Sequence, residues 1–308
     1  MDSLRGIESF VRAVEAGSIA GAARRLGISP AAASQNITRL ESQLGVRLLV
    51  RTTRSLALTD SGRVYYQRVG LLLHELNAAS EAVSELHDEP RGRLCVAATA
   101  AFARHVLAPL IPAFNRLYPH ISIELMATDR NVDHVRESVD VSIRIQPALE
   151  EGLVARHIAR VPSIFCAAPE YLAVRGVPKA PEQLQEHDCL VFRFPLDGRF
   201  LRWGFVRDGE LFYPPVRAST ISDDIDTLAR MAVAGAGITR LGAFIAAPFI
   251  ERGELVELFS PVGTGAAVAE IEPLDFYFCV GDRHQLTGKV RAFRDYLLEA
   301  VPPDWRAP

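Results

Sequence analysis

The chain has 308 residues, which is too long for one ordinary domain and suits a small module joined to a larger one. Apolar residues make up 49% and charged residues 23% of the sequence, a balance that is typical of a folded globular protein and excludes a disordered one. Residues 1–58 hold eight arginines against four acidic residues, whereas the rest of the chain carries a net negative charge. A basic N-terminal part on an acidic body predicts that this part meets a polyanion.

The sequence lacks the marks of an export signal, a membrane span or a metal site. Its N-terminus is charged and amphipathic, and no run approaches the roughly 18 apolar residues of a membrane-spanning helix. The eight histidines are scattered without metal-ligand spacing, and the cysteines form no C-x-x-C pair. We therefore expect a cytoplasmic protein, away from the membrane, with no bound metal or cofactor. The expected buried, reduced thiols are Cys95, Cys166, Cys189 and Cys279.

Three short helices are predicted at the N-terminus. Apolar residues at helical spacing indicate a helix over residues 3–16 that ends at Gly17. Ser18 is a suitable N-cap for a second helix, which stops at Gly27. Ser29 and Pro30 open a third helix that runs to Gly45. Two short helices joined by a four-residue turn are typical of a helix-turn-helix motif.

The third helix has an apolar face and a polar face. Ile37, Leu40 and Leu44 are expected to pack inward. The opposite face would lie in a major groove, where short polar side chains reach base edges and phosphates. The run VRLLVRTTRSLALT predicts a two-stranded wing for phosphate or minor-groove contact. The DNA-binding residues expected from this pattern are Ser29, Pro30, Ala31, Ala32, Ser34, Gln35, Thr38 and Arg39 of the helix, and Arg51 and Arg54 of the wing. The alternative is an ordinary three-helix bundle with a hairpin.

A long helix is predicted over residues 60–89, about 45 Å in length. Apolar residues along it alternate in spacings of four and three, the period of a coiled-coil seam. A narrow apolar stripe on so long a helix favours a partner helix from a second copy, and a dimer would match two DNA half-sites. The alternative is packing along the chain's own body. The predicted seam is Tyr65, Val69, Leu72, Leu76, Ala79, Val83 and Leu86.

Beyond residue 90 strands alternate with helices, which predicts βαβ units and mostly parallel sheets. A first group has strands at LCVAAT, ISIELMAT and VDVSIRI, with VDHVRES as a helix. Near the end of the chain, a strand at LDFYFCV and a helix at LTGKVRAFRDYLLEAV are expected to belong to the same group. A second group has strands near SIFCAA, CLVFRF, LRWGFV and GITRL, a helix capped by Ser222, and a helix at AFIAAPFIER. The chain is expected to cross between the two lobes near residues 160–163 and 263–273.

Ligands in open α/β sheets bind beyond the carboxyl ends of strands and between lobes. Arg144 could grip a carboxylate with both arms of its guanidinium, and a helix N-terminus follows Thr99. These features predict a small organic acid as the effector. Arg144 could instead pair with Asp129 or Asp140 and hold the fold. The expected effector-binding residues are Thr99, Ala100, Phe102, Thr128, Arg144, Ser219 and Thr220.

The sequence contains none of the common catalytic motifs, neither G-x-S-x-G nor a phosphate-binding loop nor H-E-x-x-H. His187, Asp188 and Cys189 are adjacent in a loop and are not expected to converge on a substrate. We therefore expect no enzyme. A solute-binding receptor without a DNA role is the alternative that the body alone would allow, and the N-terminal module argues against it.

The N-terminal pattern resembles the signature of LysR-type transcriptional regulators. The resemblance implies a recognition helix at 30–44 and a wing at 47–58, and VDVSIRI, AVAGAGITRL and KVRAFRDYL extend it over the body. Arg often follows the recognition-helix serine in that family, whereas this chain has Gln35, and glutamine favours adenine where arginine favours guanine. The signature residues are Gly17, Ser18, Ile19, Ala22, Ala23, Leu26, Ser29, Ser34, Ile37, Leu40, Glu41, Leu44, Gly45, Leu48, Arg51, Leu58, Thr59 and Gly62.

The expected fold is thus an all-α winged helix-turn-helix head (residues 1–59), a coiled-coil linker helix (60–89) and a two-lobed α/β effector domain (90–308) similar to periplasmic solute-binding proteins. Lobe one is expected at about 91–161 and 267–302, and lobe two at about 162–266. The expected function is regulation of transcription, with promoter binding modulated by a small-molecule effector between the lobes. The expected partners are double-stranded promoter DNA, the effector and a second copy in a homodimer. The resemblance also allows a tetramer and a contact with RNA polymerase.

Overall fold

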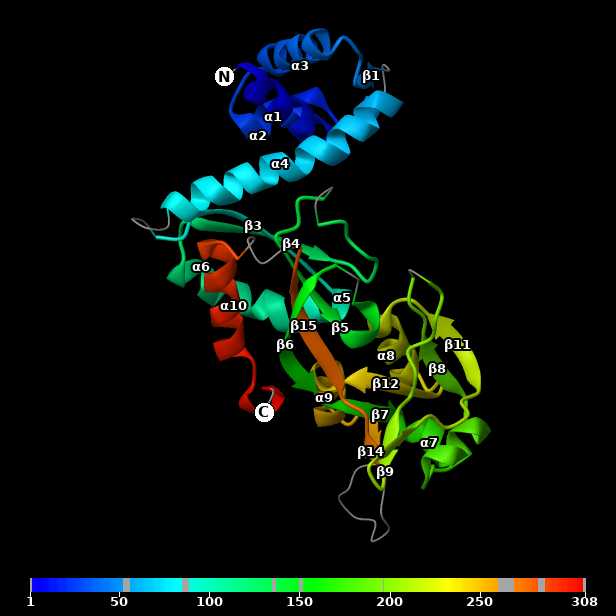
Figure 1. Cartoon of the computed structure of the whole chain (residues 1–308). Coiled ribbons are helices and arrows are strands. Elements are labelled where there is room, and N and C mark those ends of the chain that lie inside the picture. Colours follow the sequence, from blue (N-terminus) through cyan, green and yellow to red (C-terminus); the bar gives the residue numbers. More distant parts are fainter. Residues whose placement is uncertain are drawn as a thin grey trace. The chain divides into compact units, whose positions relative to one another are not determined.

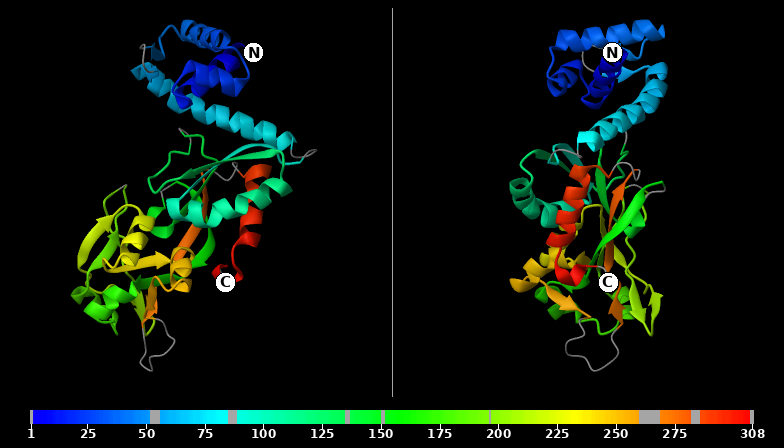
Figure 2. Two further views of the ribbon diagram at one scale, coloured as in Figure 1. Left: turned by 180° about the vertical axis from the view of Figure 1, so that it is seen from behind. Right: turned by 60° about the vertical axis from the view of Figure 1, so that its left-hand side comes forward.

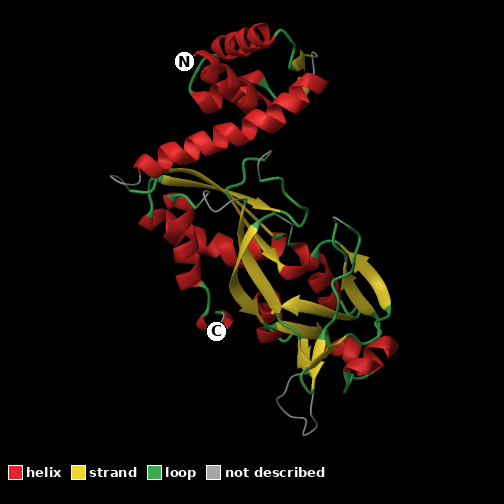
Figure 3. Ribbon diagram, viewed as in Figure 1, coloured by secondary structure: helices red, strands yellow, loops and turns green. Residues whose placement is uncertain are grey.

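The computed structural model describes residues 2–51, 56–84, 89–134, 137–149, 152–195, 197–259, 269–281 and 286–306. The chain divides into an N-terminal unit built on residues 1–89 and a C-terminal unit built on residues 90–132, 140–282 and 289–308 (Figure 1). The first unit is mainly helical, and the second carries the larger sheets (Figure 3). No helix in the described part of the chain is long and apolar enough to cross a membrane.

The head begins with three helices, α1 (Asp2–Glu15), α2 (Ile19–Leu26) and α3 (Pro30–Leu44). The predicted caps are confirmed, since the hydroxyl groups of Ser18 and Ser29 accept hydrogen bonds from the first turns of α2 and α3 at 3.1 Å. Gly27 ends α2 in the left-handed conformation, with φ of 64°, which glycine adopts without steric cost. The helices enclose a core of Phe10, Val11, Ala13, Ala22, Ile37 and Leu40.

A two-stranded wing follows α3, as predicted. Strands β1 (Leu49–Arg51) and β2 (Leu56–Leu58) pair in antiparallel register, with Leu49 opposite Leu58. The carboxylate of Glu41 on α3 accepts hydrogen bonds from the backbone N–H groups of Leu48 at 2.8 Å and Leu49 at 3.0 Å. Glu41 thereby fixes the start of the wing to the third helix.

The long helix α4 (Asp60–Ser84) starts inside the head. Gly62 lies so close to the wing that a Cβ there would overlap the carbonyl oxygen of Leu48, so only glycine fits. Tyr66, Val69 and Leu73 of α4 are buried in the core of the head. The first half of α4 is therefore part of the head's fold.

Lobe one of the C-terminal unit is a five-stranded sheet of order β4-β3-β5-β15-β6. Helices α6 and α10 lie side by side (Figure 2), where the ring of Phe114 meets the edge of Phe293 at 5.4 Å. The strands are β3 (Gly92–Ala98), β4 (Ile121–Ala127), β5 (Val141–Ile145), β6 (Val154–Val161) and β15 (Leu274–Val280), and the helices are α5 (Ala100–Phe102), the π-type turn η1 (Ala103–Leu107), α6 (Ala108–Leu117), the 3₁₀ turn η2 (Gln146–Ala148), α10 (Gly288–Ala300) and η5 (Pro303–Trp305).

Lobe two is a second five-stranded sheet of order β11-β8-β12-β7-β13, with a three-stranded sheet β10-β9-β14 beside it. The strands are β7 (Ser163–Ala167), β8 (Cys189–Phe192), β9 (Phe205–Arg207), β10 (Glu210–Phe212), β11 (Ala218–Ser222), β12 (Ile238–Gly242), β13 (Val256–Leu258) and β14 (Glu270–Ile271), and the helices are α7 (Pro169–Arg175), η3 (Pro181–Glu186), α8 (Ile225–Val233) and α9 (Ala243–Glu251).

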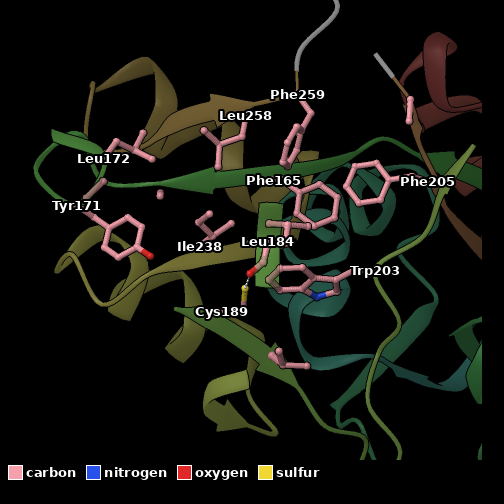
Figure 4. Packing of buried hydrophobic residues seen from close by; sticks show 14 residues of the cluster. Phe165, Tyr171, Leu172, Leu184, Cys189, Trp203, Phe205, Ile238, Leu258 and Phe259 are labelled. Atoms are coloured by element: carbon pink, nitrogen blue, oxygen red, sulfur yellow. Dashed lines mark hydrogen bonds between the residues drawn. The ribbon is translucent and has the colours of Figure 1, made fainter. Parts of the chain in front are cut away.

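An aromatic cluster joins the two sheets of lobe two (Figure 4). Phe165 of β7 stacks on Phe205 of β9 with ring centroids 4.7 Å apart, and Trp203 and Phe259 meet Phe165 edge-on. Rings this well buried contribute much of a lobe's stability through apolar area and ring contacts. The cluster therefore holds the small sheet, and the segment that leads to it, firmly on the large one.

Several secondary-structure predictions are wrong. The sheets are mixed and not mostly parallel, because β15 runs antiparallel to β5 and β6, and β7 runs antiparallel to β12 and β13. Residues 201–206 supply strand only from Phe205. The described part of the predicted helix at residues 132–138 is not helical and has turns at His134, Glu137 and Ser138. Ser222 does not cap α8: the cap is Asp224, whose carboxylate accepts a hydrogen bond from the N–H of Asp226.

The chain passes between the two lobes twice. It leaves β6 at Val161 and enters β7 at Ser163, and it leaves β14 at Ile271 and enters β15 at Leu274. We call residues 161–163 and 271–274 the hinge segments, since they connect the lobes. Any cleft between the lobes is thus bordered by these two short crossings.

Candidate DNA-binding surface and effector cleft

The outer face of α3 is polar and accessible, as the sequence predicts. Gln35, Thr38 and Arg39 are exposed there, and Ala32 and Ser34 are half-buried. The hydroxyl of Thr38 donates a hydrogen bond to the backbone carbonyl of Ser34 at 3.0 Å. The exposed residues at the start of the helix are Ser29, Pro30 and Ala31. One inward prediction is wrong, because Leu44, at the last turn, is 39% exposed.

Several exposed arginines of the head have no counter-ion in the part of the chain that the structure describes. Arg25 lies 3.4 Å from the carboxylate of Glu15, which also pairs with Arg12. Arg24, Arg39 and Arg47 are exposed, and none of the three has an ion-pair partner among the described residues. Uncompensated arginines beside a polar helix face are suited to phosphate groups.

The structure describes the predicted wing arginines and the predicted dimer seam only in part. The side chain of Arg51 is not described, and Arg54 lies outside the described residues. In the seam, Tyr65 and Val69 pack into the core of the head, whereas Leu72 is 62% and Leu76 is 45% exposed. Ala79 and Val83 lie on α4, and Leu86 lies outside the described residues.

Between the two lobes lies a cavity of about 60 Å³. Lobe one contributes Thr99, Asp129 and Arg144, and lobe two contributes Ile225 and Arg240. The apolar part of its wall is formed by Ile145, Phe192, Phe194, Leu201, Phe244, Ile245 and Phe276. The cavity is therefore mostly apolar, with a guanidinium from each lobe and one carboxyl group.

Arg144 is anchored in lobe one. It is 2% exposed, and its Nη1 donates a hydrogen bond to the backbone carbonyl of Thr128 at 2.7 Å. Asp140, one of its predicted alternative partners, instead lies 3.4 Å from Lys289. Burial raises the pKa of Asp129 above its usual range, although the N–H of Ala100 and the charge of Arg144 oppose the shift. Arg144 and Asp129 thus share the polar corner of the cavity.

Of the remaining predicted effector residues, some contribute to the cavity and others do not. Thr99 lines the cavity, and Thr128 contributes through its carbonyl. Phe102 is fully buried and stacks on Phe276 at 4.4 Å, behind the cavity wall. Ser219 and Thr220 lie on the edge strand β11 and do not line the cavity, and the hydroxyl of Ser219 donates to the carbonyl of Cys189.

Arg240 is a residue that sequence reasoning missed. It is 3% exposed, and its guanidinium donates to the Ser163 hydroxyl at 3.0 Å, to the Glu272 carbonyl at 2.7 Å and to the Arg202 carbonyl. Burial lowers its pKa to about 10, and the nearby carboxylate of Glu272 opposes the shift. Since Ser163 and Glu272 belong to the two hinge segments, Arg240 ties both crossings together. The available signal was an arginine inside an apolar strand, GITRL.

A second missed cluster joins the lobes. Arg104 and His105, from the π-type turn of lobe one, both contact the carboxylate of Asp226 in the first turn of α8, the histidine at 2.7 Å. Pro109 and Pro112 follow this turn and lack the N–H groups that a regular α-helical ladder needs. We call this ion cluster the lobe latch, because it links lobe one to lobe two across the cavity's edge.

The four cysteines are buried. Burial raises the pKa of Cys166 and of Cys189 to about 12. We predict that neither thiol reacts quickly with Ellman's reagent in the folded protein at any pH from 7 to 9, because both sulfurs are buried and the reactive thiolate stays scarce over this range. Stopped-flow absorbance of native against urea-unfolded protein measures this. Rapid modification of more than two of the four thiols in the native protein would contradict it.

The comparisons with known proteins agree with this architecture. Residues 4–63 match the bacterial regulatory helix-turn-helix protein, lysR family, and residues 87–302 match the LysR substrate binding domain. The regulator CrgA of Neisseria meningitidis is 35% identical over 95% of each chain, and the activator AaeR of Escherichia coli is 31% identical over 97% of this chain and 95% of that one.

Two solved full-length structures are similar to this one. That of CrgA from Neisseria meningitidis has 30% identity and a TM-score of 0.57, and it covers 96% of this chain and 97% of its own. That of the Vibrio cholerae virulence activator AphB has 28% identity and a TM-score of 0.58, and it covers 96% of this chain and 98% of its own.

A helix-turn-helix head with uncompensated arginines, joined to a two-lobed domain with a polar corner in its cleft, defines a ligand-responsive DNA-binding protein. The chain belongs to the family of LysR-type transcriptional regulators, which bind DNA and effector ligands and form oligomers.

Proposed function

We propose that the protein binds promoter DNA through the outer face of α3 and the wing. The observation that carries this proposal is the set of exposed arginines Arg24, Arg39 and Arg47, which have no ion-pair partner among the described residues and lie on the same small head as the polar face of α3. The base-reading residues would be Ser34, Gln35 and Thr38 with Arg39 beside them, and the residues at the start of α3, Ser29 to Ala32, would approach the phosphates. Arg51 and Arg54 of the wing would add backbone contacts. Residues 1–59 form this module in our proposal.

The second element of the proposal is a homodimer through residues 60–89. Leu72 and Leu76 are one helical turn apart on α4 and are strongly exposed, as an apolar seam awaiting a partner would be. In this arrangement Tyr65 and Val69 support the head, and the contact between copies begins at Leu72. A tetramer of two dimers and a contact with RNA polymerase are further assemblies that such a regulator would use, in the cytoplasm where the promoter lies.

The third element is a small organic acid bound between the lobes of residues 90–308. The guanidinium of Arg144 supplies the charge, and the apolar wall supplies the rest of the contact surface. The protein would act by binding alone and not as an enzyme. The effector would work by shifting the closure of the lobes, and it can do so only as far as it binds the two states unequally.

Footprinting on the intergenic DNA upstream of its own gene, together with the sedimentation mass of the complex, tests the DNA-binding proposal. A protected, nearly palindromic site that binds a dimer or tetramer, with affinity falling steeply as salt rises, is the expected result. A monomer that protects no site at low salt would instead point to a solute-binding receptor.

We predict that Arg144→Ala weakens binding of an acid effector by about tenfold or more, because a hydrogen-bonded charge partner is lost. Promoter affinity without effector should stay as in the wild type. Acids found by thermal-shift screening of the wild-type protein can then be titrated by calorimetry. Arg156→Ala, which removes an exposed arginine from β6 of the same sheet, is the matched control. If a folded Arg144→Ala variant and the wild type bound the acid with equal affinity, Arg144 would not be an effector-binding residue.

A further inference from the structure

A second, larger hollow opens beside the hinge segments. Its volume is about 730 Å³, within the roughly 300–1,000 Å³ of small-molecule sites. Its walls come from the turn after β5 (Gln146 and Pro147), from residues 199–202, and from the second hinge segment with Asp275. The wall that it shares with the inter-lobe cavity is formed by Ile145, Phe194, Leu201, Arg240 and Leu274. We call this hollow the hinge pocket.

Among the described residues that line the hinge pocket, one guanidinium has no acidic partner. Arg199 is bound by the carboxylate of Asp197. Burial favours the neutral form of Asp275, but hydrogen bonds from Arg160 and His157 at 2.9 Å outweigh this and lower its pKa, so the carboxylate is ionised and already paired.

Glu272 faces Arg240 at 3.8 Å. Arg202 is exposed, and the described residues include no acidic partner for it. Its side chain is held instead over the ring of Tyr213, with Cζ 4.9 Å from the ring centroid.

Aromatic surface surrounds this guanidinium. Phe200 is 47% and Tyr213 is 43% exposed, and both line the hinge pocket. The aromatic ring of a ligand can pack against the rings of Phe200 and Tyr213 while an anionic group of the same ligand binds the guanidinium of Arg202. The ring of Tyr213 already holds this guanidinium in place. Apolar rings next to one unpaired arginine therefore favour a ligand with an aromatic body and one carboxylate.

Hydrogen bonds of Arg240 link the hinge pocket to the hinge segments. The backbone carbonyl of Arg202 accepts a hydrogen bond from Arg240, which also holds Ser163 and Glu272 of the two hinge segments. We propose that the hinge pocket is a second ligand site, adjacent to the inter-lobe cavity, that binds an aromatic carboxylate through Arg202 and so biases the angle between the lobes.

Calorimetric titration of the full-length protein with 2-naphthoate tests this site. We expect saturable binding that Arg202→Gln weakens by about tenfold or more. The neutral analogue 2-naphthalenemethanol should bind at least about tenfold more weakly than the acid. The variant retains the backbone carbonyl that Arg240 needs, so its melting temperature should match the wild type.

Arg207→Gln is the matched control. Arg207 is also exposed and stacked on an aromatic ring, that of Phe212 at 4.6 Å, but it does not line the hinge pocket. Its substitution should leave 2-naphthoate affinity unchanged. Equal binding by wild type and Arg202→Gln, or equal binding of acid and alcohol, overturns the proposal. Binding that is lost in Arg144→Gln and kept in Arg202→Gln would place the acid between the lobes, which also overturns it but leaves the proposed function intact.

Discussion

Replacing Gln35 with arginine should change the preferred base at one position of each DNA half-site from adenine to guanine. Gln35 is exposed in the second turn of α3, close enough to the helix start to reach a base edge. A glutamine amide matches the N6 and N7 edge of adenine, whereas a guanidinium matches O6 and N7 of guanine. Each such pairing is worth about 1–3 kcal/mol of discrimination, and a dimer applies it twice.

Selection of binding sites from a randomised DNA pool, at one fixed salt concentration, measures this change for wild type and variant. Gln43→Arg is the control, since it adds the same charge to an exposed position near the far end of α3. That variant should tighten binding to all sequences alike and leave the selected site unchanged. Identical selected sites for Gln35→Arg and wild type would show that Gln35 reads no base.

Removing the guanidinium of Arg240 should destabilise the C-terminal unit by about 3–5 kcal/mol, since several buried acceptors then lose their donor at once. Arg240→Met leaves the Ser163 hydroxyl and the carbonyls of Arg202 and Glu272 without this partner. The side-chain volume is roughly kept, so the loss reflects hydrogen bonding and not a cavity. Urea denaturation followed by the fluorescence of the buried Trp203 reports on this lobe.

Two further variants make the Arg240 experiment specific. Arg230→Met removes an exposed arginine from α8 of the same lobe and should leave the denaturation midpoint near that of the wild type. Arg240→Lys keeps the charge but cannot reach three acceptors in a planar fork, so it should lie between Arg240→Met and wild type. A midpoint for Arg240→Met equal to that of the wild type would refute the role assigned to Arg240.

The head could be predicted from the sequence almost residue by residue, because its signals are local. A serine cap, a glycine that tolerates a positive φ and a proline in the first turn each act within four residues, and Ser18, Gly27 and Pro30 lie where such signals place them. The exposed face of α3 follows from helical periodicity. Leu44 departs from it because the last turn of α3 extends past the packed core.

In the C-terminal unit, strand direction and long-range side-chain partners could not be predicted from local sequence signals. The antiparallel direction of β15 depends on the chain returning from the other lobe, which strand patterns do not reveal. The roles of Arg240 and Asp226 depend on partners more than 30 residues away in the chain. Ser219 and Thr220 have suitable chemistry for a polar ligand, but sheet order places them on an edge strand. Arg144 was identifiable because burying a charged side chain in an apolar strand is costly unless the charge has a partner or binds a ligand.

The lobe latch has a consequence for how sensitive the regulator is to its effector. With Arg104 and His105 on Asp226, the space between the lobes is about 60 Å³, well below the size typical of ligand sites. In the proposed function, an effector would bind only the fraction of molecules in which the lobes are further apart, and its apparent dissociation constant would exceed the intrinsic one by the reciprocal of that fraction. The concentration at which a promoter responds would then depend partly on the ionic contacts of the lobe latch. Changes there would retune the response threshold without altering which molecule is recognised.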